Sequence, residues 1–333
     1  MTYVLVVISL TLAFPWPGVA IARRLAGVLP PLWACWMLTS AAVLLAGGTV
    51  AALVALFHVP FLASLEHVSL TRVWRTWPTA VVFAGAAGAI MLAQLVLLVR
   101  RWAEHRAVLR RAWQSADAGT RDEGVLVVSG TGVDAFALPA YGGREAQIVV
   151  TSQMVRALKP DEQAVLLAHE RAHLAGRHHL LSAIVDLGSV VHPALRHLRD
   201  SLTFHLERWA DEKAAATVGD RRVAAAAIAR AALARGSDRG AGGYPLLSAV
   251  SGPVPRRVEA LLLPAPVVPR RTGQRALVLL LAGVVVAAGL SALGLAYGLH
   301  EYVEYAARRL IGDPSGCSGM WGTLEHWFGS GAP

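Results

Sequence analysis

Charged side chains and cysteine are both scarce in this 333-residue sequence, and each shortage excludes a class of protein. Charged residues make up 16% of the chain and hydrophobic residues 55%, whereas an ordinary soluble domain has about 25% charged residues. Together with a mean hydropathy of +0.49, this balance excludes an ordinary soluble protein and predicts several membrane spans. The two cysteines, Cys35 and Cys317, are too few for a disulfide framework or a cysteine-based metal site.

Lysine is also rare, so arginine supplies most of the positive charge behind the formal net charge of +9. The arginines gather beside apolar segments and lack the interleaved aromatic side chains on which nucleic-acid bases stack. We therefore expect them to contact the anionic surface of a lipid bilayer and to orient the chain, with no direct binding of nucleic acid.

Four uncharged stretches are long enough to cross a bilayer, which requires about 20 apolar residues: residues 2–22, 32–57, 79–99 and 276–299. Arginines follow the first and the third stretch and precede the fourth. Basic residues favour the cytosolic side of a membrane, so these arginines are expected in the cytosol. Their positions predict a multi-pass protein of the cell membrane with its N-terminus outside. The predicted domains are three transmembrane helices, a cytosolic domain, a fourth transmembrane helix and a short extracytoplasmic tail, in residues 1–100, 101–274, 275–299 and 300–333.

The pentapeptide HERAH at residues 169–173 carries the clearest chemical signal. Proline and two acidic residues within residues 159–162 predict that its helix begins there. On a helix, residues four apart share a face, so His169 and His173 can bind one zinc ion while Glu170 points toward the open side. Zinc lowers the pKa of a bound water to about 7, and Glu170 can then accept the proton as general base. The alternative is a surface helix that carries two solvated histidines.

A third zinc ligand is expected from a second helix, predicted at residues 194–218 after the helix-breaking Pro193. Glu207 and Asp211 share one face of it because they are four residues apart. We assign Glu207 as the third ligand of a single zinc ion per chain, and Asp211 as the acceptor of the free N–H of a ligating imidazole. Without HERAH, a solvated acidic turn would explain the two carboxylates equally well.

Short strands followed by helices make the cytosolic segment an α+β domain. Apolar runs separated by glycine and proline predict the strands at residues 124–129, 135–138 and 147–151. Further helices are expected at residues 178–191 and 221–235. The predicted fold is thus an α+β zinc peptidase domain inserted between transmembrane helices 3 and 4 of a four-span α-helical membrane protein.

The segment AFALPAYGGREAQIVVTSQMVRALKPDEQAVLLAHERAHLAGRHHLL, with the later ERWAD, resembles the membrane zinc peptidases of the BlaR/MecR antirepressor type. It is more distantly similar to the HtpX/Ste-type membrane proteases. The resemblance implies that zinc is bound by His169, His173 and Glu207, that Glu170 is the base, and that Asp211 matches the final acid of the ExxxD motif. It also implies that an edge strand binds an extended substrate peptide by β-augmentation, through residues Gln147, Ile148, Val149, Val150 and Thr151.

One part of that family pattern is missing. Antirepressor receptors that sense β-lactams carry an outer penicillin-binding domain with an acylating Ser-x-x-Lys. The only lysines here are Lys159 and Lys213, and neither has a serine three residues earlier. The resemblance therefore extends to the peptidase and leaves the activating signal open.

These observations predict a membrane zinc endopeptidase that cleaves a cytosolic or membrane-proximal protein, with a transcriptional repressor as the substrate that the resemblance suggests. A housekeeping protease for damaged membrane proteins is the alternative within the same enzyme class. A non-catalytic, zinc-stabilised membrane receptor is the alternative of another class, and Glu170 disfavours it because a structural zinc site needs no general base. The arginine-rich helices beside the spans leave a homodimer open.

Overall fold

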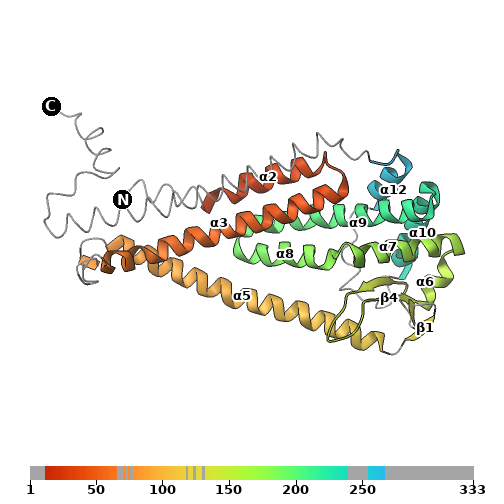
Figure 1. Cartoon of the computed structure of the whole chain (residues 1–333), viewed down its shortest axis with the longest axis horizontal. Coiled ribbons are helices and arrows are strands. Elements are labelled where there is room, and N and C mark those ends of the chain that lie inside the picture. The colour runs from red at the N-terminus through yellow and green to blue at the C-terminus, as the bar shows by residue number, and fades with distance from the viewer. Residues whose placement is uncertain are drawn as a thin grey trace.

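The computed structural model describes residues 12–65, 71, 74–75, 78–117, 119–122, 125–129, 132–238 and 254–266. The molecule is elongated: the long helices α3 (Pro31–Leu65) and α5 (Pro78–Ala116) extend toward one end, and a small sheet with the shorter helices gathers at the other (Figure 1). The predicted fourth span at residues 276–299 and the tail at 300–333 lie outside the described residues.

Two described helices are long and apolar enough to cross a membrane, at Pro31–His58 and Val81–Ala116. They correspond to the second and third predicted spans. The first predicted span is described only from residue 12 onward, where helix α2 covers Pro15–Ala26. Helix α5 continues without a break from its apolar part into the arginine-rich part. Its large apolar side chains point outward, with Leu92 63% exposed, which suits a helix that lipid covers.

The sheet has four strands in the order β1-β2-β4-β3, with β1 at Thr120–Asp122, β2 at Val125–Val128, β3 at Ala135–Leu138 and β4 at Gln147–Thr151. Strand β4 pairs with β2 in parallel and with β3 antiparallel. The prediction that residues 147–151 form an edge strand is therefore wrong. Both sides of β4 are occupied by backbone hydrogen bonds, and its nearly continuous buried run from Ile148 to Thr151 is typical of a central strand. The edges of this sheet are β1, which the sequence analysis missed, and β3.

Two helices that the sequence analysis did not predict, Ser152–Ala157 and Val254–Leu262, accompany the predicted ones. The helices after the sheet otherwise follow the predicted order, with small differences at their ends. They are α6 (Ser152–Ala157), α7 (Pro160–Ala175), α8 (His178–Val191), the 3₁₀ turn η1 (Pro193–Arg196), α9 (His197–Val218), α10 (Arg221–Asp238) and α12 (Val254–Leu262). Helix α7 begins where the sequence predicts: Pro160 occupies its first turn, and the Glu162 carboxylate accepts the backbone N–H of Lys159 at 2.9 Å. Helix α9 ends at Gly219, whose φ of 80° is easily adopted only by glycine.

The largest apolar cluster joins the helices after HERAH to those before the sheet. Side chains of α8, η1 and α9 pack on side chains of α2 and α3, with Leu38, Val185 and Leu202 fully buried among them. A charged contact supports the same arrangement: Arg101 and His105 of α5 reach Asp186 of α8 at 2.7 Å and 2.9 Å. The helix that carries Glu207 is therefore anchored on the apolar helices.

Gly188 on α8 provides a test of this packing, because it lies against Ala42 of α3. A Cβ atom at Gly188 would meet Leu195 at 3.5 Å and Ala42 at 3.8 Å, which are ordinary contact distances. Gly188→Ala should therefore keep or raise the melting temperature in detergent, since alanine favours a helix by about 0.5–1 kcal/mol over glycine. Gly188→Leu should lower it, because overpacking costs about 1–3 kcal/mol. Equal melting temperatures for the two variants would contradict the packing of α8 on α3.

Candidate metal centre

Helices α7 and α9 pack side by side and bring three potential metal ligands together. Nε2 of His169 and Nε2 of His173, one turn apart on α7, are separated by 3.1 Å. The carboxylate of Glu207 on α9 reaches both: Oε2 lies 3.6 Å from Nε2 of His169, and Oε1 lies 3.5 Å from Nε2 of His173. One ligand atom from each of these residues lies within 4.8 Å of the other two. The structure thus brings together the three residues that the sequence predicts as ligands.

The spacing of these atoms fits a zinc ion. Zinc binds imidazole nitrogen and carboxylate oxygen at about 2.0–2.2 Å in tetrahedral geometry, so two ligand atoms of one site should be about 3.3–3.5 Å apart. The distances of 3.1, 3.5 and 3.6 Å agree with that spacing. Two histidines and one glutamate are also a donor set found in catalytic zinc sites, which keep a fourth position for water or substrate.

Asp211 lies where its predicted role requires. Its Oδ1 is 3.0 Å from Nδ1 of His169, the ring nitrogen that faces away from His173 and Glu207. Among the described residues, no other group lies within hydrogen-bonding reach of this buried nitrogen, so Asp211 is its candidate acceptor. A carboxylate in this place fixes the tautomer and the orientation of a metal-binding imidazole.

Two further residues support the cluster, and the sequence analysis missed both. Nδ1 of His178 is 2.8 Å from Nδ1 of His173, so His178 can hold the second imidazole as Asp211 holds the first. The turn between α7 and α8 makes this contact possible: a Cβ atom at Gly176 would lie only 2.5 Å from Nε2 of His178. The available signal was the pair His178-His179, two residues after the glycine that caps α7.

The second missed residue is Arg257 on α12, which contacts both carboxylates of α9. Nη1 of Arg257 lies 2.8 Å from Oε2 of Glu207. Its Nε and Nη2 donate to Oδ2 and Oδ1 of Asp211, both at 2.7 Å. Arg257 is 46 residues beyond Asp211 in the chain, and no spacing rule connects the two positions.

Burial and these neighbours shift the pKa values of the cluster in different directions. Burial alone would lower the pKa of His169, but Asp211 and Glu207 outweigh it and raise that pKa to about 9. Burial, with His169 nearby, lowers the pKa of His173 to about 4. Burial would raise the pKa of Glu207, but Arg257 and the histidines hold it well below its usual range. At neutral pH the Glu207 carboxylate is therefore ionised and the His173 imidazole is neutral, whereas His169 must release a proton before it can bind a metal ion.

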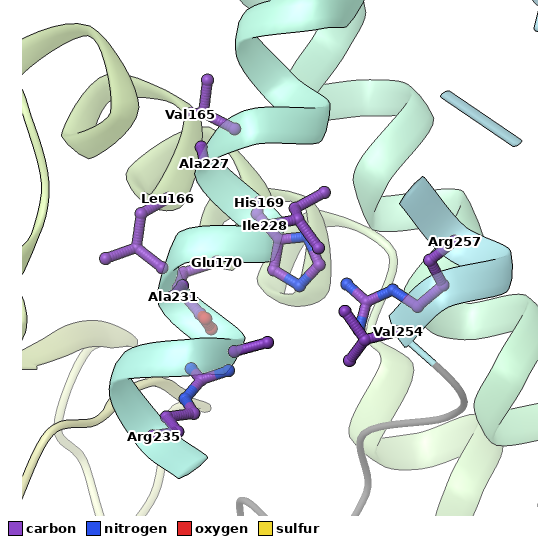
Figure 2. A pocket seen from close by; sticks show the side chains of 11 residues that line it. Val165, Leu166, His169, Glu170, Ala227, Ile228, Ala231, Arg235, Val254 and Arg257 are labelled. Atoms are coloured by element: carbon purple, nitrogen blue, oxygen red, sulfur yellow. The ribbon is translucent and has the colours of Figure 1, made fainter. Parts of the chain in front are cut away.

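Glu170 lies next to the ligand His169, and both residues line a small cavity beside α10. Glu170 is 5% exposed, and this burial raises the pKa of its carboxyl group to about 7, although His169 and Arg235 oppose the shift. Figure 2 shows Glu170 and Arg235 with their charged ends toward one another, and Arg257 directed from α12 toward His169. These residues line a cavity of about 150 Å³ whose other walls are mostly apolar.

A larger cleft, of about 880 Å³, leads to the same residues from the other side. Its walls include residues of β3 and three residues of HERAH, which are His169, Glu170 and His173. Arg101 of α5 and Asp186 of α8 also line it. Strand β3 lines this cleft, whereas none of the predicted edge residues from Gln147 to Thr151 does. The structure thus separates the predicted strand from the site and brings Ala135, Phe136 and Ala137 of β3 to it.

Residues 100–239 match the family model described as Peptidase family M48, a family of zinc metalloproteases. No curated protein and no solved structure matches the chain. The matched segment contains α7 and α9 with His169, Glu170, His173, Glu207 and Asp211, and it ends before α12. The chain is therefore a metallopeptidase, a hydrolase that acts on peptide bonds, and its His169-His173-Glu207 cluster is compatible with a metal site.

Proposed function

We propose that this protein is an integral membrane zinc endopeptidase that cleaves a cytosolic or membrane-proximal protein. The observation that carries the proposal is the meeting of His169, His173 and Glu207 beside the buried Glu170, at the wall of a cleft bordered by a sheet edge. A structural zinc site would need neither a carboxyl group at Glu170 nor an open cleft.

In this proposal His169, His173 and Glu207 hold one zinc ion, and Asp211 orients the imidazole of His169. When bound, zinc supplies Lewis acidity, which polarises a peptide carbonyl and makes a water molecule easier to deprotonate. The Glu170 carboxylate takes a proton from the attacking water, whose oxygen adds to the carbonyl carbon. The same carboxyl group then gives the proton to the amine that leaves as the C–N bond breaks.

The substrate peptide is proposed to bind along β3 in place of the strand first expected. Thr151 donates its N–H to the carbonyl of Asp134 at 2.9 Å, so in the alternating antiparallel pattern Ala135 and Ala137 direct their backbone groups away from β4. The carbonyl of Ala135 accepts from Nη2 of Arg235 at 3.2 Å. Ala137 is then left to pair with an extended peptide lying in the cleft.

We further propose a regulatory role in which the substrate is a transcriptional repressor. The support is the resemblance of residues 135–181 to antirepressor peptidases. Substrate range separates this role from quality control: a regulatory enzyme should cut one site in a folded cytosolic regulator and leave a generic unfolded protein largely intact. Faster cleavage of the unfolded protein would favour the quality-control role.

The proposed orientation places the peptidase segment in the cytosol and residues 300–333 outside. Its support is the clustering of arginines at the cytosolic ends of the predicted spans, such as Arg100, Arg101 and Arg106 on α5. The same clustering would hold the cleft next to the membrane surface, because Arg101 lines it.

Exchange of Glu170 tests the proposed chemistry. Glu170→Gln should lower peptide cleavage by about 10²–10⁴-fold, the usual contribution of a general base, while the zinc content stays at one per chain. Glu207→Ala should lose cleavage and zinc together, because it removes a ligand. The measurements are cleavage of protein substrates by the detergent-solubilised chain and zinc per chain by elemental analysis. Glu145→Gln, an exposed exchange, is the control, and a Glu170→Gln protein with wild-type activity would refute the mechanism.

A proline in β3 tests the binding edge. Ala137→Pro removes one backbone donor that faces the cleft, so the KM for a peptide substrate should rise several-fold while the zinc content is unchanged. Ala137→Val keeps that donor and should behave like the wild type. Steady-state kinetics on both variants provide the measurement, and an unchanged KM for Ala137→Pro would remove β3 from the proposal.

Reporter fusions test the orientation. A reporter that is active only in the cytosol should work when inserted within residues 237–243 and should be silent when fused after residue 333. A reporter that is active only outside the cytosol should give the reverse pattern at the same two positions. If both reporters gave the opposite results, the active site would face outward.

A further inference from the structure

Helix α12 brings one charged side chain into the metal centre from outside the segment that matches the peptidase family. The match ends at residue 239, whereas α12 covers Val254–Leu262. Arg257 on this helix is 5% exposed, and Figure 2 shows its guanidinium group directed into the site. A buried arginine requires partners, because an unpaired charge in the protein interior is strongly unfavourable.

The partners of Arg257 are the two carboxylates that the site depends on. Nε and Nη2 form a two-pronged contact with Asp211, at 2.7 Å each, and Nη1 lies 2.8 Å from Oε2 of Glu207. The planar, rigid guanidinium group fixes the direction of both side chains, which a flexible lysine ammonium could do for only one of them. The other oxygen of Glu207, Oε1, remains directed at His173 at 3.5 Å.

A second arginine holds α12 in place without contacting the metal centre. Arg221 on α10 donates to the backbone carbonyls of Ala260, Leu261 and Leu263 at 3.0 Å each. It also pairs with Glu212 of α9. Arg221 and Arg257 therefore both connect α12 to α9, but only Arg257 contacts Glu207 and Asp211.

We propose that Arg257 is a positioning residue of the metal centre, which holds Glu207 so that its carboxylate faces the two histidines and holds Asp211 against His169. The proposal rests on the proposed function, because it assigns Arg257 a role toward the zinc ligands. Arg257 acts through Glu207 and Asp211 and not on the substrate. The residue that completes the metal centre thus comes from the part of the chain that leads toward the predicted fourth span.

Metal binding separates this role from simple docking of α12. In Arg257→Met the zinc affinity, measured by competition with a chelator, should fall about 10-fold to 100-fold, the usual effect of losing a residue that supports a metal ligand. The visible spectrum of the cobalt-substituted protein should also change, because it reports the geometry of the ligands. For Arg257→Lys, the zinc affinity and the cobalt spectrum should both lie between those of Arg257→Met and those of the wild type.

Arg221→Met is the matched control. It removes a second polar link between α12 and α9, so it should lower the melting temperature while leaving the zinc affinity and the cobalt spectrum close to those of the wild type. Equal losses of zinc affinity in Arg221→Met and Arg257→Met would overturn the proposal, since docking alone would then explain both. Wild-type affinity and spectrum in Arg257→Met would overturn it as well.

Arg257→Lys carries the test if Arg257→Met does not fold, because it keeps the buried positive charge. A lysine variant with wild-type zinc affinity and an unchanged cobalt spectrum would then overturn the proposal, and a weakened, altered site would support it. Failure of the proposed function would look different from failure of the Arg257 proposal. The wild-type chain would then bind less than one zinc ion per chain, or Glu170→Gln would retain full cleavage.

Discussion

The pairing of buried charges between α7, α9 and α12 is the constraint on which the site depends. Two imidazoles from α7 face two carboxylates from α9, and these acids are close enough to repel one another unless a cation lies between them. Arg257 supplies that cation at 2.7–2.8 Å from both. Removing one side chain of such a network leaves the remaining charges buried without a partner, which is strongly destabilising. The network therefore fixes how the three helices pack, and the packing in turn fixes the donor atoms.

The apolar helices take part in the same construction. Helix α9 carries Glu207 and Asp211, and its first half is packed on α2 and α3 through residues such as Leu198 and Leu202. Helix α8 follows HERAH directly and is held between α3 and α5 by Val185 and Asp186. The active centre is consequently continuous with the helices that are apolar enough for a membrane. Its geometry depends on packing that extends well beyond the ligands.

The order of the strands in the sheet decides which strand a substrate peptide can reach. Strand β4 leads directly into α6 and α7, and the resemblance implied that this strand is the edge that binds substrate. In space, β3 crosses to the outer side of β4 and lies next to α7, with Asp134 and Thr151 joined by hydrogen bonds at the end of the pair. Which strand is at the edge depends on the order of pairing, and the local pattern of side chains does not specify that order.

Local rules were sufficient to find the reactive group of this chain. The i, i+4 spacing places His169 and His173 on one helical face, the Pro160 helix start lies where the sequence predicts, and the strands at Ala135–Leu138 and Gln147–Thr151 have the predicted bounds. The same spacing rule assigned Glu207 and Asp211 to one face of a separate helix, and the structure brings both residues to the histidines. Only the tertiary structure could decide the rest. The contact of His178 with His173 depends on the tight turn at Gly176, the strand at the edge depends on sheet order, and Arg257 reaches Glu207 through the packing of α12 on α9. These three features arise between residues that no short-range periodicity connects, because they are set by how whole elements pack.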